Sequence, residues 1–164
     1  MKTPKIKLQL TRTDWILEAI GLLGIFLPAV YLFANYNALS DATPTHYNAI
    51  GQPNKFSGKS SLFILPAVAL AIYIILTIAL RFPHLFNHPF EITEENAERQ
   101  YKNMTLLVRI LKTLIVAIVL YLTFASIQNG LGKMHGLGAG FLPLTLITVF
   151  GTVVVFIYKG YKLQ

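Results

Sequence analysis

The stretch WILEAIGLLGIFLPAVYLFA, residues 15–34, decides the fold, because Glu18 is its one charged residue among 20. A helix of about 20 residues crosses the roughly 30 Å of hydrocarbon in a bilayer. Lipid supplies no hydrogen-bond partners, so an apolar segment of this length must satisfy its own backbone, which a helix does. The stretch therefore predicts a transmembrane helix.

Three more apolar segments follow, at residues 62–80, 106–125 and 137–158. The composition agrees with a lipid-exposed body, since 54% of the residues are hydrophobic, 13% are charged and the mean hydropathy is +0.57. Four spans and their connections occupy nearly all 164 residues. We expect an all-α integral membrane protein, a four-transmembrane-helix bundle forming a single membrane domain over residues 1–164, with an outer loop at 35–61 and a cytoplasmic loop at 81–105.

The lysines and arginines indicate the orientation. Four lie in the N-terminal tail (Lys2, Lys5, Lys7 and Arg12), five between Arg81 and Lys112, and two at the C-terminus, against three in the remaining loops. Positive flanks stay in the cytoplasm, so both termini are predicted to be cytoplasmic. We expect a multi-pass membrane protein. The cations of this chain, whose net charge is +7, sit at the ends of apolar runs, which argues against a nucleic-acid partner.

The cytoplasmic loop contains a helix start. Thr93 precedes Glu94 and Glu95, a pattern typical of an N-cap followed by first-turn acids. No helix breaker occurs from there to Ser126, so one long helix is predicted to begin in the cytoplasm and enter the membrane near Arg109.

Glu18 is the acidic residue expected inside the first span, and an ionisable group there is a candidate functional residue. We expect an intramembrane ion pair with Arg109 or Lys112, which enter the third span from the same side. Proton transfer is the alternative. The ion pair is favoured because Glu18 lies about one turn inside Trp15 and no series of acids continues across the bilayer.

The outer loop reads PTHYNAIGQPNKFSGK over residues 44–59. His46 is a candidate metal ligand, with Asp41, Asn48 and His135 as possible companions on one face. In the structural alternative, His46 and Asn48 bind loop backbone, Gly51 and Gly58 supply unusual dihedrals, and Lys59 lies among the headgroups. We favour that alternative because no second histidine stands at a His-x-x-x-His spacing from His46, and no catalytic or phosphate-binding motif is present.

This loop resembles the domain of unknown function found in SdpI-like bacterial immunity proteins. The matching pattern is Pro-x-His-aromatic-Asn-x-x-Gly, followed by a glycine and a lysine. A second matching stretch covers residues 87–101, and Asn54 departs from the family, which often has an acidic residue there. The resemblance extends over most of residues 15–125 and implies the short four-span form. The residues it assigns to ligand or partner recognition are His46, Tyr47, Asn48, Gly51, Gly58 and Lys59, to which we add Lys55 of the same loop. The resemblance also implies a location in the bacterial inner membrane.

The resemblance implies protection of the producing cell from a membrane-active peptide toxin and relay of the toxin's presence to a repressor. We therefore expect a non-enzymatic protein that uses no cofactor. Its partners are the lipid bilayer and a peptide toxin or another membrane protein, recognised through the outer loop. Two alternatives remain open: an accessory subunit of a larger membrane complex, and a membrane enzyme or metal site centred on His46.

Overall fold

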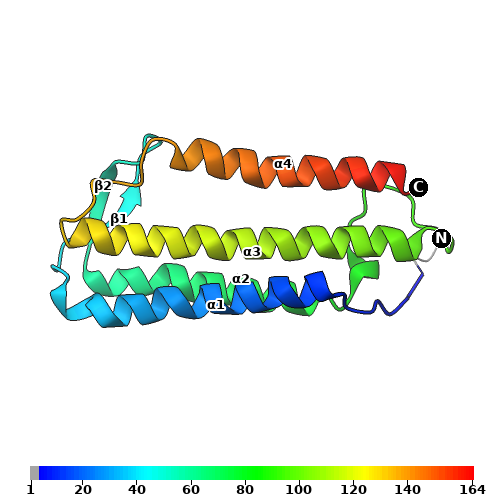
Figure 1. Ribbon diagram of the computed structural model, residues 1–164, viewed down its shortest axis with the longest axis horizontal. Coiled ribbons are helices and arrows are strands. Elements are labelled where there is room, and N and C mark those ends of the chain that lie inside the picture. The colour runs from blue at the N-terminus through cyan, green and yellow to red at the C-terminus, as the bar shows by residue number, and fades with distance from the viewer. Residues whose placement is uncertain (1–3) are drawn as a thin grey trace.

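The computed structural model describes residues 4–164 as an elongated bundle of four helices that run alternately up and down (Figure 1). The helices are α1 (Arg12–Asn35), α2 (Ile64–Ala79), α3 (Ala97–Gly130) and α4 (Phe141–Lys162). In the described part of the chain these helical regions are long and apolar enough to cross a membrane, which confirms the predicted fold class. Lys2, counted above among the N-terminal cations, lies outside the described residues.

The start of α1 is fixed by a capping box. The Thr11 hydroxyl accepts a hydrogen bond from the Asp14 N–H at 3.2 Å, and the Asp14 carboxylate accepts one from the Thr11 N–H at 2.7 Å. These two bonds satisfy backbone donors that the first helical turn leaves without partners. As a result, α1 begins just before the predicted span of residues 15–34 and contains all of it.

The other apolar segments fit the helices with one difference. Residues 62–79 fall in a 3-10 turn (Lys59–Phe63) and α2, whose C-cap is Leu80, and residues 106–125 fall within α3. The fourth segment was predicted to begin at Leu137, but α4 begins at Phe141. Gly136 and Gly138 have φ of 95° and 83°, a left-handed conformation that a helix cannot include, so the chain turns there first.

Thr93 was predicted to be the N-cap of the long helix, but α3 begins at Ala97 and its N-cap is Asn96. The Thr93 hydroxyl accepts from the Asn96 N–H at 3.3 Å, and the Asn96 amide oxygen accepts from the Thr93 N–H at 2.9 Å. This reciprocal pair resembles a capping box with asparagine in place of glutamate. A turn over residues 94–96 then leads into the helix.

The connection between α1 and α2 is more regular than predicted. It begins with a 3-10 turn (Tyr36–Ala38) and then forms an antiparallel hairpin of β1 (Thr43–Tyr47) and β2 (Pro53–Ser57) at the end of the bundle opposite the termini (Figure 1). We expected a loop without regular structure in a purely helical protein. The pairing is short and its register is irregular, so the sequence lacks the strict alternation that identifies a strand.

The centre of the bundle is α3, which packs against α1, α2, α4 and β1. A mid-bundle cluster joins Ile25, Tyr73 and Val116 from three helices. Leu32, Leu39, Leu62 and Ile127 form a second cluster closer to the hairpin. Gly21 and Gly24 let α1 approach its neighbours, because a side chain at either position would meet Tyr73 or Val116.

By contrast, α4 has α3 as its main neighbour and stands away from α1 and α2 (Figure 1). Its buried residues are Phe156 and Gly160, near its C-terminal end. Near that end a 3-10 turn (Pro83–Leu85) lies in the connection from α2 to α3. Most of the apolar surface of α4 is therefore left for lipid.

The glycine contacts give a test of α1–α3 packing. A Cβ at residue 24 would lie 2.5 Å from Val116 Cγ1, and the β-branched valine has little rotamer freedom in a helix. We expect Gly24→Ala to lower the free energy of unfolding by about 1–3 kcal/mol, the usual cost of overpacking. Gly151→Ala is the control, because nothing lies within 4 Å of its added methyl group. Unfolding of both variants in detergent, followed by circular dichroism, makes the comparison; equal stability would contradict the proposed contact.

Candidate functional site

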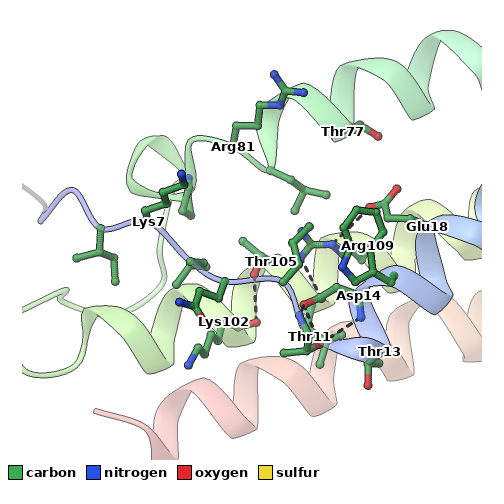
Figure 2. Close-up of a pocket in the computed structure, with 18 of the residues that line it drawn as sticks. Lys7, Thr11, Thr13, Asp14, Glu18, Thr77, Arg81, Lys102, Thr105 and Arg109 are labelled. Carbon is green, nitrogen blue, oxygen red and sulfur yellow. Dashed lines mark hydrogen bonds and ion pairs between the residues drawn. The ribbon is translucent and has the colours of Figure 1, made fainter.

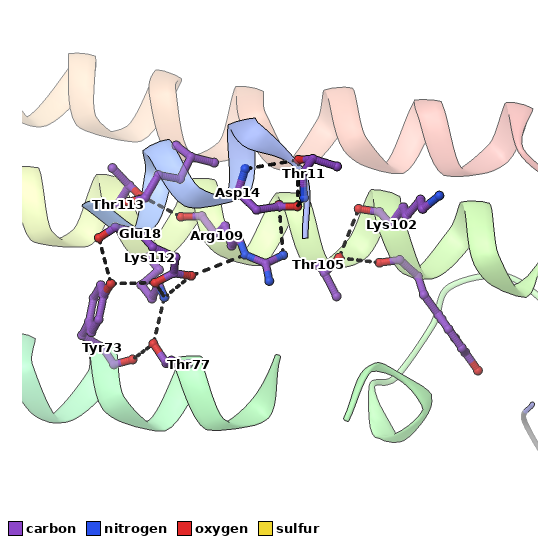
Figure 3. A network of polar contacts seen from close by, with 12 residues as sticks. Thr11, Asp14, Glu18, Tyr73, Thr77, Lys102, Thr105, Arg109, Lys112 and Thr113 are labelled. Atoms are coloured by element: carbon purple, nitrogen blue, oxygen red, sulfur yellow. Dashed lines mark hydrogen bonds and ion pairs between the residues drawn. The ribbon is translucent and has the colours of Figure 1, made fainter. Parts of the chain in front are cut away.

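Polar side chains of α1, α2 and α3 meet in one network (Figure 3), in the half of the bundle that holds the termini. At the centre of this inner charge cluster, Lys112 Nζ donates to both Glu18 carboxylate oxygens, at 2.8 and 2.7 Å, and to Thr77 Oγ1 at 2.8 Å. The Lys112 side chain is 1% exposed. The members of the cluster are Asp14, Glu18, Tyr73, Thr77, Arg109 and Lys112.

Arg109 extends the cluster toward the start of α1. Its Nη1 lies 3.1 Å from Asp14 Oδ1 and its Nε lies 3.4 Å from Glu18 Oε1. Two carboxylates thus face two cations, so the cluster has no net charge. The structure brings together Glu18, Arg109 and Lys112, the three residues that the sequence suggested for an intramembrane ion pair.

Tyr73 completes the cluster from α2. Its hydroxyl donates to Glu18 Oε2 at 2.6 Å, and its ring centroid lies 4.0 Å from Lys112 Nζ, within range of a cation–π contact. Sequence reasoning did not assign Tyr73 or Thr77 to this site. Their four-residue spacing puts both on one helix face, a signal that could have found them.

The geometry favours a structural role, in which the ion pairs link the helices, over proton transfer. Both carboxylates are paired, and the chain's five other acidic residues, Asp41, Glu91, Glu94, Glu95 and Glu98, lie in the outer connection or around the start of α3. A proton path would need further ionisable groups leading across the bilayer. The cluster instead links three helices by charge-assisted hydrogen bonds, which are the stronger class of hydrogen bond.

A pocket of about 1110 Å³ lies beside the cluster (Figure 2). The segment before α1 forms one wall, and the start of α1, the end of α2 and the first part of α3 form the others. Asp14, Glu18 and Arg109 contribute to its lining, so the cluster closes one side of the pocket. Lys7, Arg81 and Lys102 also line it.

At the other end of the bundle, the β1–β2 turn is held by Asn48. Its side-chain oxygen accepts from the Ile50 and Gln52 N–H groups at 3.2 and 2.9 Å. His46 contacts the Asn54 side-chain oxygen through Nδ1 at 2.6 Å, and both side chains are exposed. The structural interpretation of Asn48 therefore matches the contacts, whereas His46 binds a side chain rather than backbone.

Two contacts fix the hairpin to the bundle. The Tyr47 hydroxyl lies 3.0 Å from Ser126 Oγ on α3, and burial raises the pKa of the Tyr47 phenol above its usual value of 10.0. The Leu137 N–H donates to the Gly51 carbonyl at 2.7 Å. Gly51 has φ of 79° and its Cα faces the Gly138 backbone so closely that a Cβ would clash, so glycine is required there.

The remaining predicted recognition residues lie along β2 and just after it. Lys55 is exposed and stands opposite His46 in the hairpin. Lys59 donates to the Leu39 carbonyl at 3.3 Å and lies 3.7 Å from Asp41. Gly58 was expected to have an unusual dihedral, but its φ is −58°, which any residue adopts. That expectation was wrong, because the chain enters the next 3-10 turn from ordinary extended backbone.

The residues suggested as metal-binding companions of His46 have other positions or contacts in the structure. His135 lines a second pocket, of about 400 Å³, between the hairpin and the connection from α3 to α4. Asp41 pairs with Lys59 and Asn48 caps the turn. Among residues 4–164, no three His, Cys, Asp or Glu residues are grouped so that they could hold a metal ion.

These features describe a multi-pass membrane protein with a buried charge cluster and a hairpin at the end opposite the termini. The family model that matches is a domain of unknown function, DUF1648, over residues 23–70. This region contains the second half of α1, the whole hairpin and the beginning of α2. The match thus centres on the end of the bundle that carries the hairpin.

A similar protein is an uncharacterised protein of Archaeoglobus fulgidus, 39% identical over 83 residues. The aligned part covers 49% of this chain and 45% of that protein, so the similarity spans about half of each. No solved structure matches this chain.

The ion pair at the centre of the cluster can be tested by a double-mutant cycle. Lys112→Met leaves the Glu18 carboxylate without its closest cation, and breaking a buried pair in this way costs about 3–5 kcal/mol. We expect Lys112→Met to lower the free energy of unfolding by about that amount, and Glu18→Gln combined with Lys112→Met to recover much of the loss. Unfolding in detergent is measured for Lys112→Met, Glu18→Gln and the double variant.

The matched control is Glu98→Gln, which breaks the exposed Glu98–Lys102 pair on the same helix. Water screens that pair, so its loss should change stability little. If Lys112→Met is no more destabilising than Glu98→Gln, the cluster does not hold the helices together.

Proposed function

We propose that this membrane protein is not an enzyme and that it recognises an extended peptide, or an extended segment of another membrane protein, through the hairpin. The observation that carries the proposal is that one edge of β2 has no paired strand and is exposed. It pairs with β1 alone in a two-stranded sheet, and residues 54–57 are all exposed. A free strand edge presents backbone donors and acceptors that accept an added strand.

The hairpin is suited to binding because it is held in place before a partner arrives. Tyr47 fixes β1 to α3, the Gly51 carbonyl fixes the turn to the connection before α4, and Lys59 fixes the end of the hairpin to Leu39. A preordered surface loses less conformational freedom on binding, which favours affinity.

Side chains on β2 supply contacts beyond the backbone. Phe56 is 57% exposed and offers an aromatic anchor, and Lys55 next to it offers a positive charge. The resemblance to SdpI-like immunity proteins supports a membrane-active peptide toxin as the partner. The DUF1648 match supports the same region of the chain, since it includes the whole hairpin.

The proposal includes a location and an orientation. We place the protein in the inner membrane of a bacterial cell, with the hairpin outside and both termini in the cytoplasm. The distribution of lysine and arginine supports this orientation, with eleven on the terminal side and three on the hairpin side. A secreted peptide would then meet the hairpin without crossing the membrane.

The orientation can be tested by labelling, because the chain has no cysteine to interfere. Ser57 on β2 and Glu94 before α3 are both exposed. In intact cells, a membrane-impermeant maleimide should label Ser57→Cys, whereas Glu94→Cys should be labelled only after the membrane is opened. The opposite pattern would invert the proposed topology.

Recognition can be tested by challenging cells with secreted membrane-active peptides. Cells that express the chain should survive at least one peptide of a broad panel better than cells without it. Phe56→Ser should remove that protection, because it takes the aromatic anchor from β2. Phe82→Ser is the control, since Phe82 is also exposed but lies after α2, at the other end of the bundle.

The result is interpretable only with equal membrane levels of all variants, checked by immunoblot. Protection that survives Phe56→Ser, or no protection across the panel, would count against recognition by the hairpin.

A further inference from the structure

The pocket beside the inner charge cluster carries unbalanced positive charge (Figure 2). Within the cluster, Asp14 and Glu18 are matched by Arg109 and Lys112. Lys102, also in the lining, pairs with Glu98. Lys7 and Arg81 remain: both line the pocket and both are exposed, and neither forms an ion pair with any residue of the described chain.

The walls of the same pocket are mainly apolar and continue onto the outside of the bundle. Leu10, Trp15 and Leu22 line the pocket while also being exposed, Trp15 by 63%. In a bilayer these side chains meet acyl chains rather than water. A small soluble anion would use the two free cations but would gain nothing from this apolar surface.

The pocket also lies at the height where lipid headgroups begin. Lys7 precedes α1, which starts at Arg12, and Arg81 follows α2, which ends at Ala79. Both cations therefore stand at the boundary between the apolar spans and the polar end of the bundle. Leu22, by contrast, lies ten residues into α1, or about 15 Å along the helix axis.

From this arrangement we infer that the pocket is a binding site for an anionic phospholipid. The phosphate accepts hydrogen bonds from Lys7 and Arg81, and an acyl chain lies along Trp15 and Leu22. Basic pockets between membrane helices suit anionic headgroups, and each cation near such a surface strengthens binding about fivefold. The neutral cluster behind the headgroup supplies no net repulsion. This inference does not depend on the proposed role of the hairpin.

Tryptophan fluorescence reports on lipid at this site, because Trp15 lines the pocket and is the only tryptophan in the chain. The purified full chain is placed in nanodiscs of phosphatidylcholine that contain a small fraction of phosphatidylglycerol with brominated acyl chains. Bromine quenches tryptophan fluorescence on contact. We expect stronger quenching than from the same fraction of brominated phosphatidylcholine, because the anionic lipid is concentrated at the pocket.

Two double variants distinguish lipid binding at this pocket from general attraction to the positive surface. Lys7→Gln combined with Arg81→Gln should reduce the preference for phosphatidylglycerol by roughly 25-fold, at about fivefold for each cation. Lys159→Gln combined with Lys162→Gln removes the same charge from the same end of the bundle, but on α4 and outside the pocket lining. This control should keep the preference. Residue 7 lies before α1, so the single variant Lys7→Gln cannot disrupt a helix. It should reduce the preference for phosphatidylglycerol about fivefold, the effect of one cation.

Three outcomes would overturn the inference. The two brominated lipids could quench equally, or the α4 control could lose the preference as fully as the pocket variant, which would indicate nonspecific attraction. Soluble glycerol phosphate, added to the same nanodiscs, could relieve the quenching at concentrations comparable to the lipid. That result would make the site one for a free phosphate compound.

Discussion

The contact between Lys112 and Glu18 constrains the rest of the bundle. A lysine in the middle of a membrane helix is costly unless a partner compensates its charge. Here the compensation comes from α1 through Glu18 and from α2 through Tyr73 and Thr77, so one ammonium group requires three helices to meet at one height. Between apolar helices in lipid, hydrophobic burial contributes little to association, which gives such polar contacts more weight.

The arrangement of the other elements follows from this contact. Because α1 must lie close to both α2 and α3 for these contacts, Gly21 faces Tyr73 of α2 and Gly24 faces Val116 of α3, where larger side chains would force the helices apart. The Asp14 carboxylate both accepts the capping hydrogen bond that starts α1 and forms an ion pair with Arg109, so the cap and the cluster depend on the same side chain. No residue of α4 takes part in the cluster, which agrees with its looser packing along α3.

Much of the fold could be predicted from the sequence because hydrocarbon thickness sets a length that apolar segments reveal directly. The ends of the helices and the connections between them were harder to predict. The start of α4 was misplaced at Leu137 because the residues after Gly136 are apolar, while the backbone there is left-handed. The hairpin was missed because its short strands pair irregularly. Glu18, Arg109 and Lys112 could be found as isolated charges in apolar runs, whereas Tyr73 and Thr77 carry no charge and only their four-residue spacing marks them.

The position of α3 explains why the two ends of the molecule can be studied separately. It contributes Arg109 and Lys112 to the inner charge cluster and Ser126 to the hairpin contact. Fourteen residues separate Lys112 from Ser126, or about 21 Å along the helix. No member of the cluster hydrogen-bonds the hairpin in the described chain, so changing one end removes no polar contact at the other. A loss of peptide protection and a loss of lipid preference would therefore report on different surfaces of one protein.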